Sequence, residues 1–184
     1  MKTTTTHLIL SLLRIGLTAA GLASSAFGEA SVRVEPIEKV GPRPLEKQTA
    51  EKLVHDYLEA WQSLGTAFEQ NRPAVLDTSF IGVAREELEA TIHQQQAARI
   101  QTRYVDRSHN LRFSFYSSEG LSIQLLDMVE YDVELLDHAR VVGVRHLRSR
   151  YVVVFTPTEV RWKVRFFQAA PEEQRYCRSE SVTL

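Results

Sequence analysis

The sequence contains very little cysteine. Cys177 is the only cysteine in 184 residues, so no disulfide can form within the chain. A domain without disulfides must be held together by its apolar core. Cys177 lies in a polar segment, where it is either an incidental exposed thiol or the site of a bridge to a second molecule.

Sequence signatures of several chemistries are also missing. The chain contains neither GxxxxGKS/T nor GxGxxG, the motifs that bind nucleotides, and it lacks the GxSxG motif of hydrolases. It has no HExxH motif and no close Cys/His pair, the patterns typical of zinc sites. We therefore expect neither a metal nor another cofactor.

The chain has no excess of charge of either sign. Its 22 basic and 23 acidic residues give a net charge of -1. Such a balance provides no general attraction to nucleic acid or to an anionic membrane. The aromatic residues recur at core spacing and do not alternate with a basic stripe, which also argues against nucleic-acid binding.

The first 28 residues have the pattern of a signal peptide. Lys2 gives a positive start, residues 8–20 are mostly apolar, and residues 26–28 place small side chains at a cleavage site. Arg14 interrupts the apolar run, and an uncleaved membrane anchor is the alternative. We expect a periplasmic or secreted protein, which contacts the membrane only if this segment is retained.

Composition divides the remaining chain into three parts. Residues 29–45 contain three of the six prolines and are predicted to form a linker or an extended arm. Residues 46–169 carry the periodic apolar patterns of one folded domain. Residues 170–184 are polar, show no period and are predicted to be a flexible tail.

The first part of the domain is predicted to be helical. Between Glu46 and Gln70, apolar side chains recur at intervals of three and four residues, as in a long amphipathic helix. Its apolar stripe contains Leu53, Tyr57, Trp61, Leu64 and Phe68. A short helix is expected over 73–80, and a third, more exposed helix over 83–102.

From residue 109 onward, apolar and polar residues alternate, which is typical of antiparallel strands with one buried face. Turns are predicted at 117–120, 137–140 and 156–159. The last strand is predicted to bury Val160, Trp162, Val164 and Phe166. The expected fold class is α+β, with N-terminal helices packed on a curved four-stranded antiparallel sheet.

The opposite face of this sheet is predicted to be charged. Acidic residues follow one strand and basic residues follow its neighbours, so that cross-strand ion pairs would fix the register. The alternative is a basic surface that docks an anionic protein partner. That surface would consist of Arg148, Arg150, Arg161, Lys163 and Arg165.

The order of these elements resembles the NTF2-like superfamily, which includes SnoaL-like and ketosteroid-isomerase-like proteins. The likeness is carried by Leu53, Tyr57 and Trp61 and by the final V-x-W-x-V strand. Residues 80–84, followed by a polar helix, are also similar to Tim44-like domains and to the ARC6-like IMS domain. The resemblance implies a cone-shaped cavity between the first helix and a bent sheet, and it makes a homodimer through the sheet plausible. Its members include enzymes and pure interaction modules, so the fold leaves the function open.

One carboxylate interrupts the apolar pattern. Asp127 falls in the buried row between Leu125 and Val129. We expect a bulge near Leu126 to turn Asp127 outward. Otherwise its carboxylate must be paired, protonated or placed in the cavity, where an isomerase of this superfamily would need its base.

A polar cluster of Tyr104, Asp106 and His109 precedes the first predicted strand. We expect these residues on the surface at the mouth of the cone; the alternative is that His109 acts as a general base beside Asp106. The residues predicted to line a ligand cavity are Tyr57, Trp61, Tyr104, Asp127 and Tyr131.

Two functions are compatible with the sequence. The first is an exported, non-enzymatic binding domain that holds a small apolar ligand in the cone or docks a protein partner on the sheet. The alternative is a SnoaL-like or ketosteroid-isomerase-like enzyme that uses Asp127 as its cavity carboxylate.

Overall fold

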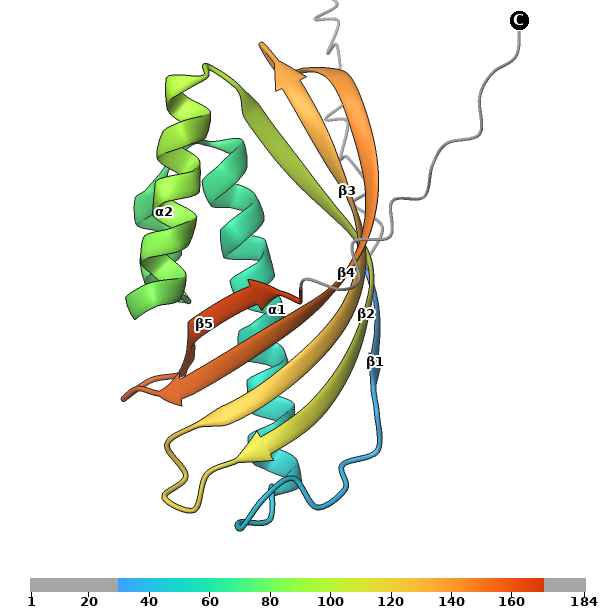
Figure 1. Cartoon of the computed structure of the whole chain (residues 1–184), viewed down its shortest axis with the longest axis vertical. Helices are drawn as coiled ribbons and strands as arrows, with labels where there is room; N and C mark the ends of the chain where they lie inside the picture. The colour runs from blue at the N-terminus through green and yellow to red at the C-terminus, as the bar shows by residue number, and fades with distance from the viewer. Residues whose placement is uncertain (1–29, 171–184) are drawn as a thin grey trace, which may run out of the picture.

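The computed structural model describes residues 30–170. The predicted signal peptide lies outside these residues, and so does the predicted tail from residue 171 onward. Helices lie along the hollow side of a strongly bent sheet (Figure 1). Among residues 30–170, no helix is long and apolar enough to span a membrane.

The helices follow the predicted order. α1 spans Lys47–Glu69 and buries the predicted stripe, including Leu53, Tyr57 and Trp61. A 3-10 helix, η1, spans Pro73–Thr78, and α2 spans Gly82–Ala97. The prediction that the third helix reaches residue 102 is wrong. The helix ends where Arg99 adopts a left-handed conformation (φ 57°), and the chain enters the sheet at Gln101.

The sheet has five strands in the order β1-β2-β3-β4-β5. Their bounds are Ser31–Val34, Gln101–Tyr116, Ile123–Asp137, Arg140–Pro157 and Trp162–Ala169. β1 pairs parallel to β2, and all other pairs are antiparallel. The predicted four-stranded antiparallel sheet is therefore corrected to a five-stranded mixed one. The additional strand comes from residues that were predicted to be a linker or an extended arm.

A bulge lies in β2 and not, as predicted, near Leu126 in β3. Asp106 pairs with Tyr131 while Ser108 pairs with Glu130, so Arg107 is the extra residue on β2. The register of β3 is continuous around Asp127 on both sides. Since side chains alternate along a strand, Asp127 faces the hollow side together with its neighbours Leu125 and Val129.

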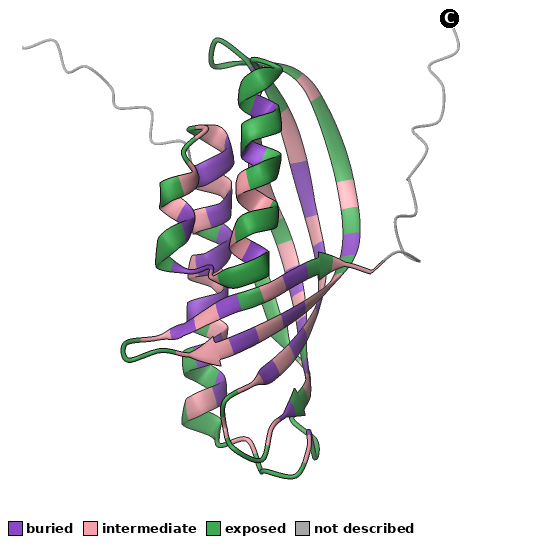
Figure 2. Ribbon diagram, turned by 60° about the vertical axis from the view of Figure 1, so that its left-hand side comes forward, coloured by how far each residue is buried: buried purple, intermediate pink, exposed green. Residues whose placement is uncertain are grey.

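The last strand also departs from strict alternation. Trp162 and Val164 are buried as predicted, but Val160 lies before the strand with 76% of its surface exposed. Val154 pairs with Phe166 while Phe155 pairs with Val164, so the register shifts at this point. As a result Phe167 is buried in the place predicted for Phe166. Figure 2 shows how buried and exposed residues alternate along the strands.

Candidate functional site

Asp127 lies fully buried at the centre of the hollow face of the sheet. The Tyr57 hydroxyl of α1 donates a hydrogen bond to Asp127 Oδ2 over 2.7 Å. His109 Nδ1 of β2 lies 2.7 Å from the same oxygen. These two partners compensate for the burial of the carboxylate. The prediction that Asp127 turns outward is therefore wrong, and the paired alternative is correct.

The β2 bulge brings a second carboxylate to the same histidine. Without Arg107 as the extra residue, Asp106 and His109 would face opposite sides of the strand; with it, both face inward. Asp106 Oδ2 lies 3.8 Å from His109 Nε2. The His109 side chain is only 1% exposed, so the prediction that it is a surface residue in a loop is wrong.

The charges around His109 fix its protonation. Burial by itself lowers the pKa of His109, but the carboxylates of Asp106 and Asp127 outweigh burial and raise the pKa to about 9. His109 is therefore an imidazolium at neutral pH. Burial and the nearby Asp127 charge raise the pKa of Tyr57 well above its usual value, so its hydroxyl remains a donor. The site thus holds one protonated histidine between two carboxylates.

Unpaired polar atoms also gather here. Four buried side-chain atoms of residues 30–170 have no hydrogen-bond partner, and three of them surround His109: Trp61 Nε1, Asp106 Oδ1 and Asp127 Oδ1. Each such atom typically costs about 1–3 kcal/mol. A fold that accumulates this cost at one place is expected to use that place for function.

A cavity of about 630 Å³ adjoins this network, between α1 and the strands β1 and β2. Its apolar lining includes Val32, Leu58, Trp61, Tyr104 and Val105, and its polar lining includes Asp106 and His109. Arg103 and Glu69 also line it and pair with each other at 2.8 Å. The cavity therefore has apolar and aromatic walls and two charged groups in its lining, the His109–Asp106 group and the Arg103–Glu69 ion pair.

A second cavity of about 330 Å³ lies between α1, α2 and the strands β4 and β5. Trp61 and Tyr104 line both cavities. The Trp61 ring also contacts His109 and Tyr131, with ring centroids 5.4 and 5.6 Å away. Trp61 is therefore the side chain that connects the helix, the His109 network and both cavities.

The structure separates the residues that were predicted to bind a ligand. Trp61 and Tyr104 line the large cavity. Tyr57 and Asp127 lie behind His109 and are fully buried, and Tyr131 stacks on Tyr104 with centroids 5.8 Å apart. Sequence reasoning placed His109 and Asp106 on the surface. Residues three positions apart share one face of a strand only where a bulge lies between them, and this was the signal that could have brought the two side chains together.

The predicted basic surface is divided between two regions. Arg161 donates to Glu59 Oε2 of α1 over 2.7 Å, and Lys163 donates to the Asp77 carbonyl of η1 over 2.7 Å. Arg165 donates to the Ser122 hydroxyl. Arg148 and Arg150 instead line a shallow hollow of about 260 Å³ beside Leu126 and Met128 of β3. Docking of an anionic partner on these residues stays a prediction.

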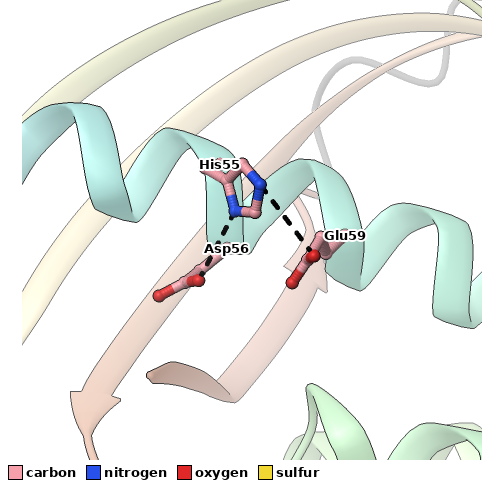
Figure 3. Close-up of side chains that lie close together, drawn as sticks. All are labelled: His55, Asp56 and Glu59. Carbon is pink, nitrogen blue, oxygen red and sulfur yellow. Dashed lines mark ion pairs between the residues drawn. The ribbon is translucent and has the colours of Figure 1, made fainter. Parts of the chain in front are cut away.

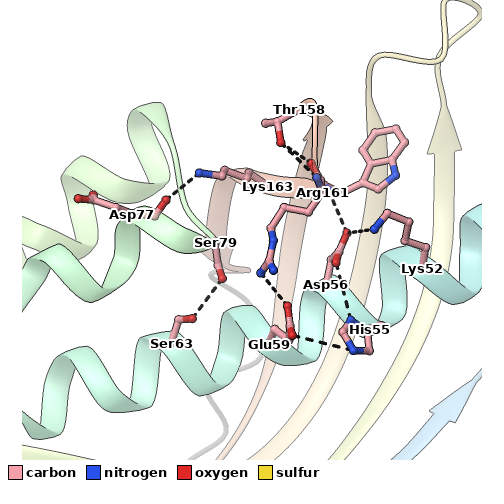
Figure 4. A network of polar contacts seen from close by, with 11 residues as sticks. Lys52, His55, Asp56, Glu59, Ser63, Asp77, Ser79, Thr158, Arg161 and Lys163 are labelled. Carbon is pink, nitrogen blue, oxygen red and sulfur yellow. Dashed lines mark hydrogen bonds and ion pairs between the residues drawn. The ribbon is translucent and has the colours of Figure 1, made fainter.

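His55, Asp56 and Glu59 form a cluster on α1 beside the start of β5, in which Asp56 is buried and His55 is exposed (Figure 3). Their carboxylates already have partners (Figure 4). Asp56 accepts the backbone N–H of Trp162 over 2.9 Å and lies 3.8 Å from Lys52, and Glu59 binds Arg161. We therefore assign this cluster to holding α1 against the start of β5 rather than to a metal.

No known protein family matches this sequence, and no curated protein matches it. Solved structures match the fold. The intermembrane-space region of the chloroplast protein ARC6 superposes with a TM-score of 0.50 and 16% identity, over 69% of this chain and 98% of that one. A candidate scytalone dehydratase from Novosphingobium aromaticivorans superposes with a TM-score of 0.47 and 12% identity, over 68% and 89% of the two chains.

The chain therefore shares the fold of the ARC6 intermembrane-space region, one of the similarities that the sequence suggested, with helices packed on a mixed five-stranded sheet. Identities this low establish the fold alone. The activity must be argued from the His109 site itself.

Proposed function

We propose that this chain is a small-molecule-binding domain whose cone holds a largely apolar, ring-sized ligand against His109. The observation that carries the proposal is the 630 Å³ cavity, whose aromatic walls end at a buried imidazolium. Cavities of about 300–1,000 Å³ with apolar walls and a few placed polar groups are typical small-molecule sites. From residues 1–28 we further propose that the domain acts outside the cytoplasm.

The lining suggests how such a ligand would be oriented. Its ring would pack against Trp61 and Tyr104, which offer flat apolar surfaces. Its polar group would meet His109 Nε2 and Asp106. These two groups are 3.8 Å apart, too far for a strong hydrogen bond with each other. A ligand hydroxyl could accept from the imidazolium and donate to the carboxylate at the same time.

Native mass spectrometry of the chain from Glu29 onward, purified from an exporting host, tests this proposal. We expect a retained mass of a few hundred daltons. Gly65 lines the cavity, and a Cβ added there would meet only the Tyr104 Cβ at 3.9 Å. Gly65→Leu should therefore fill the cavity and remove the ligand without weakening α1, because leucine favours helix more than glycine does.

The matched control is Gly143→Leu on β4, a strand that contributes no residue to the lining of this cavity; this variant should retain the ligand. Two results together would contradict the proposal: a wild-type chain without added mass, and no thermal shift with a panel of ring-sized apolar compounds. A chain without any retained ligand would instead favour the alternative function, the docking of a protein partner on the sheet.

A second candidate function is acid–base catalysis, favoured by the 2.7 Å contact between His109 Nδ1 and Asp127. A histidine held by a carboxylate can exchange a proton with a bound molecule. Asp127 itself is shielded from the cavity, so here the carboxylate would position His109 rather than act as the base. With its pKa near 9, His109 would begin as the proton donor.

The fate of the retained ligand distinguishes the two functions. If the wild-type chain converts the ligand and His109→Gln abolishes this conversion, the enzyme is favoured. If the ligand is released unchanged, the binding domain is favoured.

A further inference from the structure

An apolar groove of about 380 Å³ lies between the N-terminal half of α1 and the edge of the sheet formed by β1 and β2. Its apolar lining consists of Val34, Ile37, Ala50, Val54 and Phe113. The charged side chains of the lining already have partners: Glu35 accepts a hydrogen bond from Asn110 over 3.2 Å. Lys47 and Glu51 pair with each other at 3.6 Å. The surface that this groove offers to a ligand is therefore mainly apolar.

Several large apolar side chains near the groove are exposed. Val32 lines the large cavity, Val34 and Ile37 line the groove, and the three are 41%, 42% and 40% exposed. Exposed apolar side chains that gather at one place mark surfaces that bind an apolar partner. An apolar group bound in the groove would remove these side chains from water, which is favourable.

The apolar groove continues the large cavity along the same two elements. On β1, Val32 lines the cavity and Val34 lines the groove, and alternate residues of a strand face the same side. On α1, Leu58 lines the cavity and Val54 lines the groove, and residues four apart are neighbours on a helix surface. His109 pairs with Val32 in the sheet and therefore lies at the end of the cavity that is nearest the groove.

We propose that the apolar groove binds an aliphatic chain of the same ligand whose ring occupies the large cavity. This inference rests on the proposed function, because the chain would start at the polar group of the ligand beside His109. The ligand would then be a ring and a chain joined through a polar link that both donates and accepts hydrogen bonds, as an amide does. From Val54 to Lys47 the groove follows α1 for about 10 Å, which suits a chain of roughly six to eight carbon atoms.

The 330 Å³ cavity between α1, α2, β4 and β5 is less suited to this chain. Its lining includes neither His109 nor Asp106, so a chain that starts there would have to pass Trp61, which lines both cavities. Its lining also contains Glu87 and Gln168, which hydrogen-bond to each other over 3.4 Å. The apolar groove is therefore the better continuation of the ring site.

Two amides of one ring test the chain directly: N-methyl-2-naphthamide and N-hexyl-2-naphthamide. Their affinities for the chain from Glu29 onward are measured by titration calorimetry. We expect the hexyl compound to bind at least tenfold more tightly. Partial burial of its five additional methylene groups is sufficient for this result, because each fully buried methylene increases affinity about fourfold.

Ile37→Glu distinguishes binding in the groove from nonspecific adsorption of the hexyl chain. Ile37 lies outside the helices and strands and is 40% exposed, so a carboxylate at this position should leave the fold intact. We expect the hexyl compound to lose most of its advantage, while the affinity of the methyl compound is unchanged. The matched control Val160→Glu should keep the advantage, because Val160 is 76% exposed and lines neither the groove nor the large cavity.

The results separate the groove from the ring site. If the methyl compound binds but the hexyl chain adds less than about threefold, or if Ile37→Glu leaves its advantage unchanged, the groove proposal is overturned while the ring site stands. If neither compound binds the wild-type chain, the proposed function fails and the groove proposal fails with it. If Ile37→Glu does not fold, Val34→Thr keeps the shape of a groove side chain but adds a hydroxyl. An unchanged advantage in that variant would likewise overturn the proposal.

Discussion

Replacing Asp127 with alanine is expected to lower the free energy of unfolding by about 3–5 kcal/mol, because it removes one partner of a buried ion pair. The substitution leaves the His109 imidazolium and the Tyr57 hydroxyl buried without their shared acceptor. His109 would then lose its proton, which limits the loss but does not restore the hydrogen bonds. Urea unfolding at pH 7 measures the change.

Asp137 provides a matched control on the same strand. It also contacts a histidine, His138, at 2.6 Å, but the two side chains are 57% and 98% exposed. Exposed pairs contribute at most about 1 kcal/mol, so Asp137→Ala should change stability little. Equal small effects of Asp127→Ala and Asp137→Ala would show that Asp127 is solvated, as the sequence first suggested.

Replacing Trp61 with alanine is expected to cost about 3–5 kcal/mol, the usual range for a core aromatic residue. Trp61 is only 3% exposed, and its ring contacts Tyr151 and Phe167 with centroids 5.6 Å away in each case. The substitution would also join the two cavities that Trp61 lines. We therefore expect a lower denaturant midpoint together with altered ligand retention.

Phe115 is a suitable control for this substitution, because its side chain is 43% exposed on the same sheet. Phe115→Ala should cost less, about 1–1.5 kcal/mol, since nearly half of this side chain is already exposed to water. A Trp61→Ala protein with an unchanged denaturant midpoint would contradict the packing of α1 on the hollow face of the sheet.

Local periodicity was sufficient to predict the helices and most strands. The stripe around Leu53, Tyr57 and Trp61 has only one helical interpretation, and it is the face that α1 buries. The turn at 137–140 was equally readable, and in the structure His138 and Ala139 adopt the left-handed conformations of a tight hairpin.

The remainder depends on partners distant in sequence. β1 is four exposed residues long and has no buried face, so only its pairing with β2 makes it a strand. The first half of β2 is rich in polar residues, and its position is set by β3. For the same reason, the sequence did not show the bulge at Arg107 in β2, and the bulge that it suggested near Leu126 in β3 is not present.

The bulge at Arg107 determines which side chains meet at the site. Asp127 was correctly placed in the apolar row by alternation, and the error was to assume that a buried carboxylate had to be turned away. Its partners, Tyr57 and His109, lie 70 and 18 residues away in the sequence. Pairing between such distant residues does not show in local pattern, so the network became visible only with the fold.

The most direct test of the proposed site is the protonation of His109, followed by NMR of its ring nitrogens as pH is raised, with His109→Gln identifying the signals. We expect a pKa of about 9, so the ring should remain an imidazolium at pH 8 and lose its proton only above that. A pKa at or below about 6.5, the ordinary value for histidine, would show that neither carboxylate holds His109. It would leave the cavity without the imidazolium that the ligand is proposed to meet and would contradict the proposed mode of ligand binding.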